Sequence, residues 1–184
     1  MLRLSISGAH SVGKSTLAKT LIEHYSKKYI VAEIREVARQ LIQSGFRMSQ
    51  DITEYGIVNY INEYLRLERV LNGDFLISDR SLIDLLSYIS VNSSTKVRSN
   101  FISLVEEIVY LETAKYDLFV YVPIEIPLEE DGVRPSDLIY REKIDHKIRE
   151  LLDIYNTSWI SVSGTNEERT KIVINKIEEI SSTK

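Results

Sequence analysis

The stretch Gly8-Ala9-His10-Ser11-Val12-Gly13-Lys14-Ser15-Thr16 decides the fold of this chain. It follows a short alternating apolar segment, residues 2–7, and leads into residues 15–27, whose apolar residues have helical spacing. Gly8 and Gly13 allow the backbone to turn so that its amide groups face one point, and the start of a helix favours an anion there. Two glycines with four residues between them, followed by Lys-Ser, form the Walker A pattern. This pattern predicts a loop around the phosphates of a nucleoside triphosphate.

Two side chains of this loop have distinct predicted roles. Lys14 is expected to act in catalysis by neutralising the β- and γ-phosphates, and Ser15 to place its hydroxyl on Mg²⁺. His10 stands at a position that the pattern leaves free, and we assign it no chemistry of its own. The competing interpretation is an ordinary loop, and the strand before it and the helix after it argue against that. The predicted nucleotide-binding residues are Gly8, Ala9, His10, Ser11, Val12, Gly13, Lys14, Ser15 and Thr16.

Short apolar segments alternate with longer segments of helical periodicity along the chain. The predicted strands are residues 2–7, 29–33, 75–78, 118–122 and 159–162. The predicted helices are residues 15–27, 36–44, 48–72, 82–90, 101–114, 137–155 and 167–180. This alternation predicts an α/β fold with three α/β/α layers around a five-stranded parallel sheet, in a single domain of residues 1–184. Ligands of such sheets bind beyond the carboxyl ends of the strands.

An acid and an arginine follow the third predicted strand. Near a triphosphate, the carboxylate of Asp79 can hold Mg²⁺ directly or through water, so we predict a catalytic and metal-binding role for it. The alternative is that Asp79 caps the helix that begins near Ser81. Arg80 is predicted to bind a phosphate of the substrate, and its alternative is a solvated arginine.

A second acid follows the second predicted strand. A kinase that acts on a hydroxyl needs a group that orients it and receives its proton, and Glu36 is our choice for that catalytic and substrate-binding role. Its alternative role is to complement the dipole at the start of a helix. Arg39 lies one turn later and is expected to bind the substrate, or only to form an exposed ion pair with Glu36.

The charged segment of residues 129–149 is predicted to form a helical lid. Phosphoryl transfer benefits from cations that arrive late and exclude water. Arg134 and Arg141 are the arginines of this segment that we expect to contact the phosphates and assist catalysis. The alternative is a solvated helix of mixed charge.

Composition narrows the range of functions. The formal net charge of −4 argues against broad attraction to nucleic acid, although a local basic patch stays open. The chain has no cysteine, which excludes disulfides and thiolate chemistry. With no recognisable signal peptide and no apolar run of membrane-spanning length, we expect a cytoplasmic protein without a membrane partner. The oligomeric state stays open, a homodimer included.

The order of these motifs resembles that of the NadR-type (AAA_28-like) P-loop domain, which includes a ribosylnicotinamide kinase domain. The resemblance extends to about residue 155, and its motifs are Gly8 to Thr16, Glu36-Val37-Ala38-Arg39, Asp79-Arg80-Ser81 with Asp84 and Tyr88, Tyr116-Asp117, and Asp131-Gly132-Val133-Arg134. This group is similar in fold to nucleoside and nucleoside-monophosphate kinases. The resemblance therefore implies a P-loop NTPase fold, a mobile lid, and ATP with Mg²⁺. It also implies that Glu36 handles the acceptor, that Asp79 and Arg80 act as a pair, and that Arg134 and Arg141 are lid arginines.

The leading hypothesis is an ATP- and Mg²⁺-dependent kinase for a nucleoside-like small molecule. A close variant uses a nucleoside monophosphate as the acceptor, with Arg39 or Arg80 on its phosphate. One alternative is a nucleotide-binding switch or regulatory NTPase, although the guanine-reading pattern Asn-Lys-x-Asp of small GTPases does not occur in the sequence. Another is a phage-type kinase that acts on a modified nucleotide in DNA.

Overall fold

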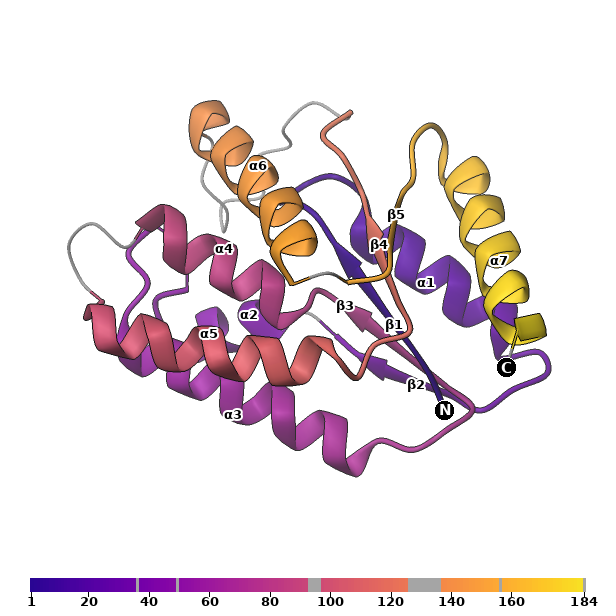
Figure 1. Ribbon diagram of the computed structural model, residues 1–184, viewed down its shortest axis with the longest axis horizontal. Helices are drawn as coiled ribbons and strands as arrows, with labels where there is room; N and C mark the ends of the chain where they lie inside the picture. The colour runs from indigo at the N-terminus through magenta and orange to yellow at the C-terminus, as the bar shows by residue number, and fades with distance from the viewer. Residues whose placement is uncertain (36, 49, 93–96, 126–136, 156, 184) are drawn as a thin grey trace.

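The computed structural model describes residues 1–35, 37–48, 50–92, 97–125, 137–155 and 157–183 (Figure 1). Its strands are β1 (Leu2–Ser7), β2 (Val31–Ile34), β3 (Phe75–Asp79), β4 (Leu118–Tyr121) and β5 (Trp159–Ser161). Its helices are α1 (Lys14–Tyr25), α2 (Val37–Gln43), α3 (Glu54–Val70), α4 (Leu82–Asn92), α5 (Ser99–Thr113), α6 (Leu138–Ile154) and α7 (Asn166–Thr183).

The strands form a single parallel sheet in the order β2-β3-β1-β4-β5. β1 lies at its centre and pairs with β3 through Ile6 and Asp79 and with β4 through Ser7 and Tyr121. The side chains of β3 and β4 are buried throughout, as expected for strands covered on both faces. Because the strands are parallel, the loop after β1 lies beside the residues that follow β3 and β4.

Helices cover both faces of this sheet. Figure 1 shows α1 and α7 on one face and α3, α4, α5 and α6 on the other. This arrangement confirms the predicted three-layer α/β/α fold with a five-stranded parallel sheet. The core between the layers consists of aliphatic and aromatic side chains from the strands, the segments next to them and the helices that cover the sheet.

Two elements begin later than the sequence pattern predicts. The long helix was expected from residue 48 but begins at Glu54, because the Thr53 hydroxyl caps it by accepting a hydrogen bond from Gly56 N at 3.2 Å. β2 was expected from residue 29 but begins at Val31. Lys28 N and Tyr29 N both donate to Tyr25 O and so continue the turn that ends α1.

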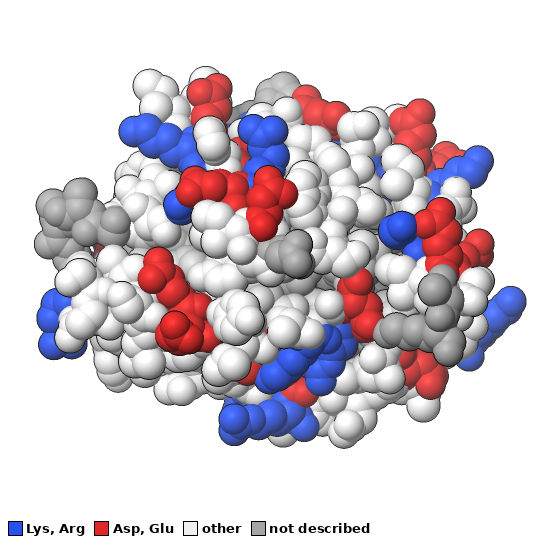
Figure 2. Space-filling model, viewed as in Figure 1, with Lys and Arg blue, Asp and Glu red and all other residues white. Residues whose placement is uncertain are grey.

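The surface carries both signs of charge. Figure 2 shows lysine and arginine interspersed with aspartate and glutamate over the described residues of the visible face. No helix in the described part of the chain is both long and apolar enough to cross a membrane. The first part of the predicted lid, including Arg134, lies outside the described residues, and its later part forms α6.

Candidate functional site

The loop between β1 and α1 has the backbone of a phosphate-binding loop. Gly8 passes so close to β4 that a Cβ atom there would lie 2.5 Å from the backbone oxygen of Val122. Gly13 has φ +94° and is the N-cap residue of α1, a conformation that glycine adopts without strain. Ser11, at φ +57°, has a left-handed conformation as well. The two glycines of the pattern are therefore required by a close approach and by a helix start.

Lys14 is the first residue of α1 and is buried. Its Nζ donates a hydrogen bond to Gly8 O at 2.8 Å and another to Ala9 O. The ammonium group therefore lies inside the curve of the loop. The next two residues, Ser15 and Thr16, are exposed at the N-terminus of α1, where helix N–H groups lack partners within the helix.

Two buried arginines hold the loop from outside. Arg141 of α6 donates from Nε to His10 O at 3.0 Å and from Nη2 to Ser11 O at 2.9 Å. Arg169 of α7 donates from Nη1 to Val12 O at 2.8 Å. The N–H and C=O groups of a planar trans peptide point in opposite directions. Fixing these three carbonyls therefore turns the amides of the following residues away from the arginines, toward the inside of the loop.

The charges of these arginines are balanced differently. Arg169 forms a 2.8 Å ion pair with Glu125, and this hydrogen bond is the main cause that holds the pKa of the Glu125 carboxyl below its usual range. Burial lowers the pKa of Arg141, and the nearby Asp145 opposes that shift. An arginine stays protonated even so, so Arg141 brings a buried positive charge against the loop.

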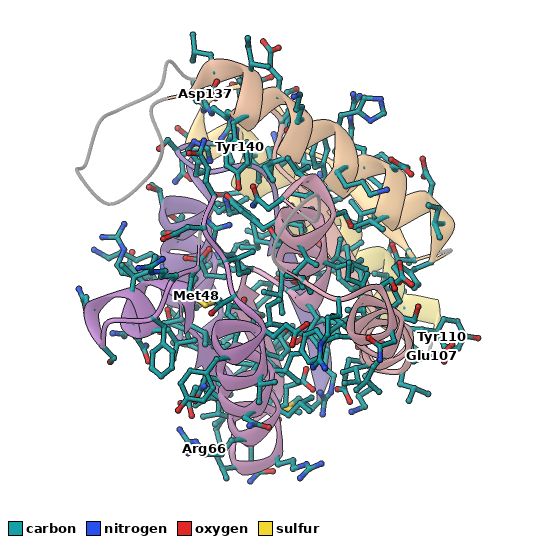
Figure 3. The ribbon with its side chains drawn as sticks, turned by 90° about the vertical axis from the view of Figure 1, so that its left-hand side faces the viewer. Met48, Arg66, Glu107, Tyr110, Asp137 and Tyr140 are labelled. Atoms are coloured by element: carbon teal, nitrogen blue, oxygen red, sulfur yellow. The ribbon has the colours of Figure 1, made fainter. Side chains whose placement is uncertain are left out.

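The start of α6 positions Arg141. Asp137 caps this helix by accepting a hydrogen bond from Tyr140 N at 3.1 Å, and Figure 3 shows both residues at that end of α6. The Tyr140 ring packs edge-on against Tyr88 of α4, with 6.2 Å between the ring centroids. The Tyr88 hydroxyl lies 3.4 Å from Nδ1 of His10. The loop, α4 and α6 are therefore connected through side chains.

The segment after β3 closes against the same loop. Asp79, at the end of β3, is buried, and its neighbour Arg80 is a non-glycine residue with φ +88°. Arg80 N donates to Ile6 O at 3.0 Å, which brings the segment beside the end of β1. The Arg80 guanidinium lies 4.0 Å from Asp84 and 5.8 Å from the Tyr88 ring centroid. A strained backbone held in place in this way is common at functional sites.

Asp84 joins this segment to the loop. Its Oδ1 accepts a hydrogen bond from Gly8 N at 3.2 Å, and its Oδ2 accepts from Ser81 N at 3.0 Å and from Ser81 Oγ at 3.1 Å. Ser81 Oγ in turn accepts from Ile83 N at 3.1 Å. Together they form a capping box at the start of α4. The helix-capping role suggested for Asp79 is therefore filled by Ser81 and Asp84.

The structure brings several of the predicted site residues together. The phosphate loop, Asp79, Arg80 and Arg141 gather at the carboxyl ends of β1 and β3. Arg39 is exposed on α2. Glu36, the predicted acceptor acid, and Arg134 of the predicted lid lie outside the described residues.

Arg169 and Glu125 are contributors that sequence reasoning missed, and Asp84 was named among the motifs but given no role. Arg169 lies on a charged helix 157 residues away from the carbonyl it binds, and no local pattern indicates such a contact. Asp84 had a usable signal, because Ser81-x-x-Asp84 at the start of an apolar helix is a capping-box spacing.

The donor set at the loop fits Mg²⁺. In the described residues, no three His, Cys, Asp or Glu side chains cluster as a metal site. Mg²⁺ in phosphate-transfer sites is bound through one or two protein groups, with phosphates and waters completing its shell. The exposed Ser15 hydroxyl beside the loop and the Asp79 carboxylate on the neighbouring strand provide two oxygen donors of this kind.

Comparison with known proteins places this geometry in a family. The structure of a deoxyadenosine kinase from M. mycoides, with the products dCMP and a flexible dCDP bound, matches with a TM-score of 0.66 at 14% sequence identity. The match covers 97% of this chain and 100% of that one, which shows a shared fold. No curated protein matches this chain in sequence. The family model AAA_28, described as an AAA domain, matches residues 3–169. The chain belongs to the AAA_28 family of P-loop domains.

Proposed function

We propose that this protein is an ATP- and Mg²⁺-dependent kinase that transfers the γ-phosphate to a hydroxyl of a nucleoside-like small molecule. The observation that carries the proposal is the phosphate loop itself. Arg141 and Arg169 fix three of its carbonyls, and Lys14 lies inside its curve. An acid–arginine pair, Asp79 and Arg80, stands on the neighbouring strand. Phosphoryl transfer depends mainly on positioning and on electrostatic stabilisation, and this arrangement supplies both.

The predicted site residues that the structure describes have the following roles in this scheme. Lys14 turns from the carbonyls of Gly8 and Ala9 to the β- and γ-phosphates. Ser15 and Asp79 hold Mg²⁺, which, when bound, neutralises charge on the phosphate oxygens. Arg80 binds the acceptor or its phosphate, since a guanidinium matches phosphate geometry. These are the roles that the sequence predicts for the same residues.

The remaining proposed roles concern the acceptor hydroxyl and the transferring phosphoryl group. Glu36 orients the acceptor hydroxyl and receives its proton, and Arg39, three residues later in the sequence, binds the substrate. Arg134 and Arg141 stabilise charge on the transferring group, and Arg141 also holds the loop. The deoxyadenosine kinase with the same fold carries deoxyribonucleotide products, which favours a nucleoside or nucleotide acceptor here as well.

A turnover assay tests the proposal. Purified protein is incubated with ATP, Mg²⁺ and a panel of ribo- and deoxyribonucleosides, their monophosphates and nicotinamide riboside, and ADP and phosphorylated products are measured. We expect ADP release that depends on at least one acceptor and equals product formed. ADP release that ignores every acceptor would support the nucleotide-binding switch instead.

The Lys14→Ala variant tests the loop assignment, with Lys19→Ala as its matched control. Lys19 lies on the same helix, is exposed, and pairs with Glu23 at 3.9 Å. We expect ATP·Mg²⁺ to raise the thermal midpoint of the parent and of Lys19→Ala but not that of Lys14→Ala. Equal stabilisation of all three proteins would refute the assignment.

A further inference from the structure

A series of polar contacts runs from α3 to the backbone of Arg80. The Tyr116 hydroxyl lies 2.7 Å from Oε1 of Glu68 and 2.6 Å from the Tyr64 hydroxyl. The Tyr64 hydroxyl lies 3.3 Å from Oγ of Ser78, and Ser78 Oγ donates to Arg80 O at 2.5 Å. We call Glu68, Tyr116, Tyr64 and Ser78 the relay. The relay connects a carboxyl at one end of the sheet with the strained residue at the other.

The relay has four hydrogen-bonding positions but only three hydroxyl protons. Burial raises the pKa of both tyrosines above the ordinary value of 10, so each keeps its single proton. Ser78 donates its proton to Arg80 O. For Tyr64 and Ser78 to form a hydrogen bond, Tyr64 must therefore be the donor. For Tyr116 and Tyr64 to form a hydrogen bond as well, Tyr116 must then donate to Tyr64. All four contacts are therefore hydrogen bonds at the same time only if the Glu68 carboxyl supplies the fourth proton.

The surroundings of Glu68 are compatible with a protonated carboxyl. The residue is 5% exposed, and its buried Oε2 accepts no hydrogen bond from the described residues. Burial and the Glu112 carboxyl of α5 raise the pKa of Glu68 to about 7. The hydrogen bond with Tyr116 and the charge of Arg3 of β1, at 3.4 Å, oppose that shift. Lys115, before β4, lies 4.0 Å from the same carboxyl. Lys115 also forms an ion pair with Glu112, so only part of its charge acts on Glu68.

We propose that Glu68 is a positioning residue, whose carboxyl proton completes the relay and so holds the backbone of Arg80 in its left-handed conformation. A non-glycine residue keeps such a conformation only where its neighbours fix it. Ile6 O fixes Arg80 N from β1, and Ser78 fixes Arg80 O. The relay orients the Ser78 hydroxyl for the second of these bonds.

Ionisation of Glu68 breaks the relay at a definite place. Tyr116 then donates to the carboxylate, which is the stronger acceptor. Tyr64 turns its proton to Tyr116, and Ser78 no longer receives a hydrogen bond from Tyr64. The hydrogen bond that breaks is the longest of the four, at 3.3 Å. The consequence for acceptor binding rests on the function proposed above, in which Arg80 binds the acceptor, whereas the proton count does not.

A titration of the Glu68 carboxyl tests the proton count without any assay of activity. In protein labelled with ¹³C at glutamate side chains, the Glu68→Gln variant identifies the Glu68 carboxyl signal. We expect its midpoint near the value of about 7 that its surroundings set. In Glu112→Gln the midpoint should move down, because one source of the upward shift is gone. A midpoint in the ordinary glutamate range near 4.5 would overturn the proposal.

Kinetics test the effect on Arg80. The KM for the acceptor should rise about fivefold as pH increases from about 6 to 8, the change expected when one hydrogen bond breaks, with a smaller change in kcat. Glutamine donates to Tyr116 at every pH, so the KM of Glu68→Gln should stay low throughout. Tyr116→Phe and Ser78→Ala break the relay at every pH. Both variants should therefore show the raised KM already at the lowest pH of the series. Tyr25→Phe is the control, since it removes a buried hydroxyl that has no hydrogen-bond partner in the described part of the chain.

The outcomes separate the two proposals. If parent and Glu68→Gln share one pH profile of KM, the relay proposal is wrong while the kinase proposal stands. If no acceptor is phosphorylated at any pH, the kinase proposal fails, and the carboxyl titration still decides whether Glu68 carries the fourth proton.

Discussion

At the scale of single residues, the least expected feature is the pair of buried arginines that bind the phosphate loop from α6 and α7. An arginine on a charged helix is usually solvated, and exposed ion pairs contribute little to stability. Arg141 instead is 2% exposed and binds two carbonyls of a loop 130 residues earlier. Arg141 thus has one role in fixing the loop backbone and a proposed second role at the phosphates. The two roles predict different effects of replacing it.

Replacing Arg141 by methionine separates these roles. Methionine keeps most of the volume but leaves the carbonyls of His10 and Ser11 without their donors. An unsatisfied buried polar group costs about 1–3 kcal/mol, so the free energy of unfolding in urea should fall by about 2–4 kcal/mol. The affinity for ATP should fall with it, because the loop amides lose their orientation.

Arg149→Met is the matched control, since Arg149 is exposed two turns later on the same helix. It should unfold and bind ATP as the parent does. If Arg141→Met keeps the parent's stability and ATP affinity and loses only kcat, the arginine acts on the transferring phosphate and not on the loop.

At the scale of elements, α4 is coupled to the loop by the Asp84 carboxylate. Both of its oxygens are used, one by Gly8 N and the other by Ser81. In Asp84→Asn an NH₂ group replaces one oxygen and faces a donor. We expect a loss of about 1–3 kcal/mol in stability and a weaker affinity for ATP, measured by urea unfolding and calorimetric titration.

Ser81→Ala provides the comparison for Asp84→Asn. It removes the cap of α4, worth about 1 kcal/mol, but leaves the bond between Asp84 and Gly8 N in place. ATP should therefore bind to Ser81→Ala nearly as well as to the parent. Equal losses of ATP affinity in both variants would mean that the helix cap, and not the link to Gly8, positions the loop.

Most elements could be predicted from the sequence because their causes are local. The strand before Gly8, the helix after Gly13 and the stop of α2 at Gly45, whose φ is +90°, follow from patterns within a few residues. The start of α3 could not be predicted from apolar periodicity, because the cap at Thr53 overrides a pattern that extends further toward the N-terminus.

At the scale of the whole molecule, the strand order assembles the candidate site. The parallel sheet was predictable from the alternation of strands and helices, and so was the expectation that ligands bind at the carboxyl ends. The placement of β1 between β3 and β4 was not, because strand order depends on packing across the whole core. That order is what brings Asp79 and Arg80 beside the loop. The hydrogen bond from Arg169 to the loop and the hydrogen bonds of the relay likewise join segments that are distant in sequence. Apolar periodicity cannot predict such contacts.

The same placement of Glu68 predicts how global stability depends on pH. Its pKa is about 7 in the folded protein, against 4.5 as the ordinary value, so the folded state holds this proton more tightly. Stability therefore falls as pH rises from about 4.5 to about 7. The half-buried Asp145, whose pKa is also raised by burial, acts in the same direction. Glutamates such as Glu63 and Glu125, whose pKa values are lowered by arginine, act in the opposite direction and only toward lower pH.

Urea unfolding at a series of pH values checks this prediction. The free energy of unfolding of the parent should decrease, on the order of 1–3 kcal/mol, between pH of about 5 and about 8. Glu68→Gln has no proton to lose and should show a flatter curve in that window. Glu63→Gln, on the same helix but in the exposed pair with Arg66, should keep the parent's slope there. A parent curve that rises across this window would mean that Glu68 is ionised in the folded protein and that Arg3 and Lys115 outweigh its burial.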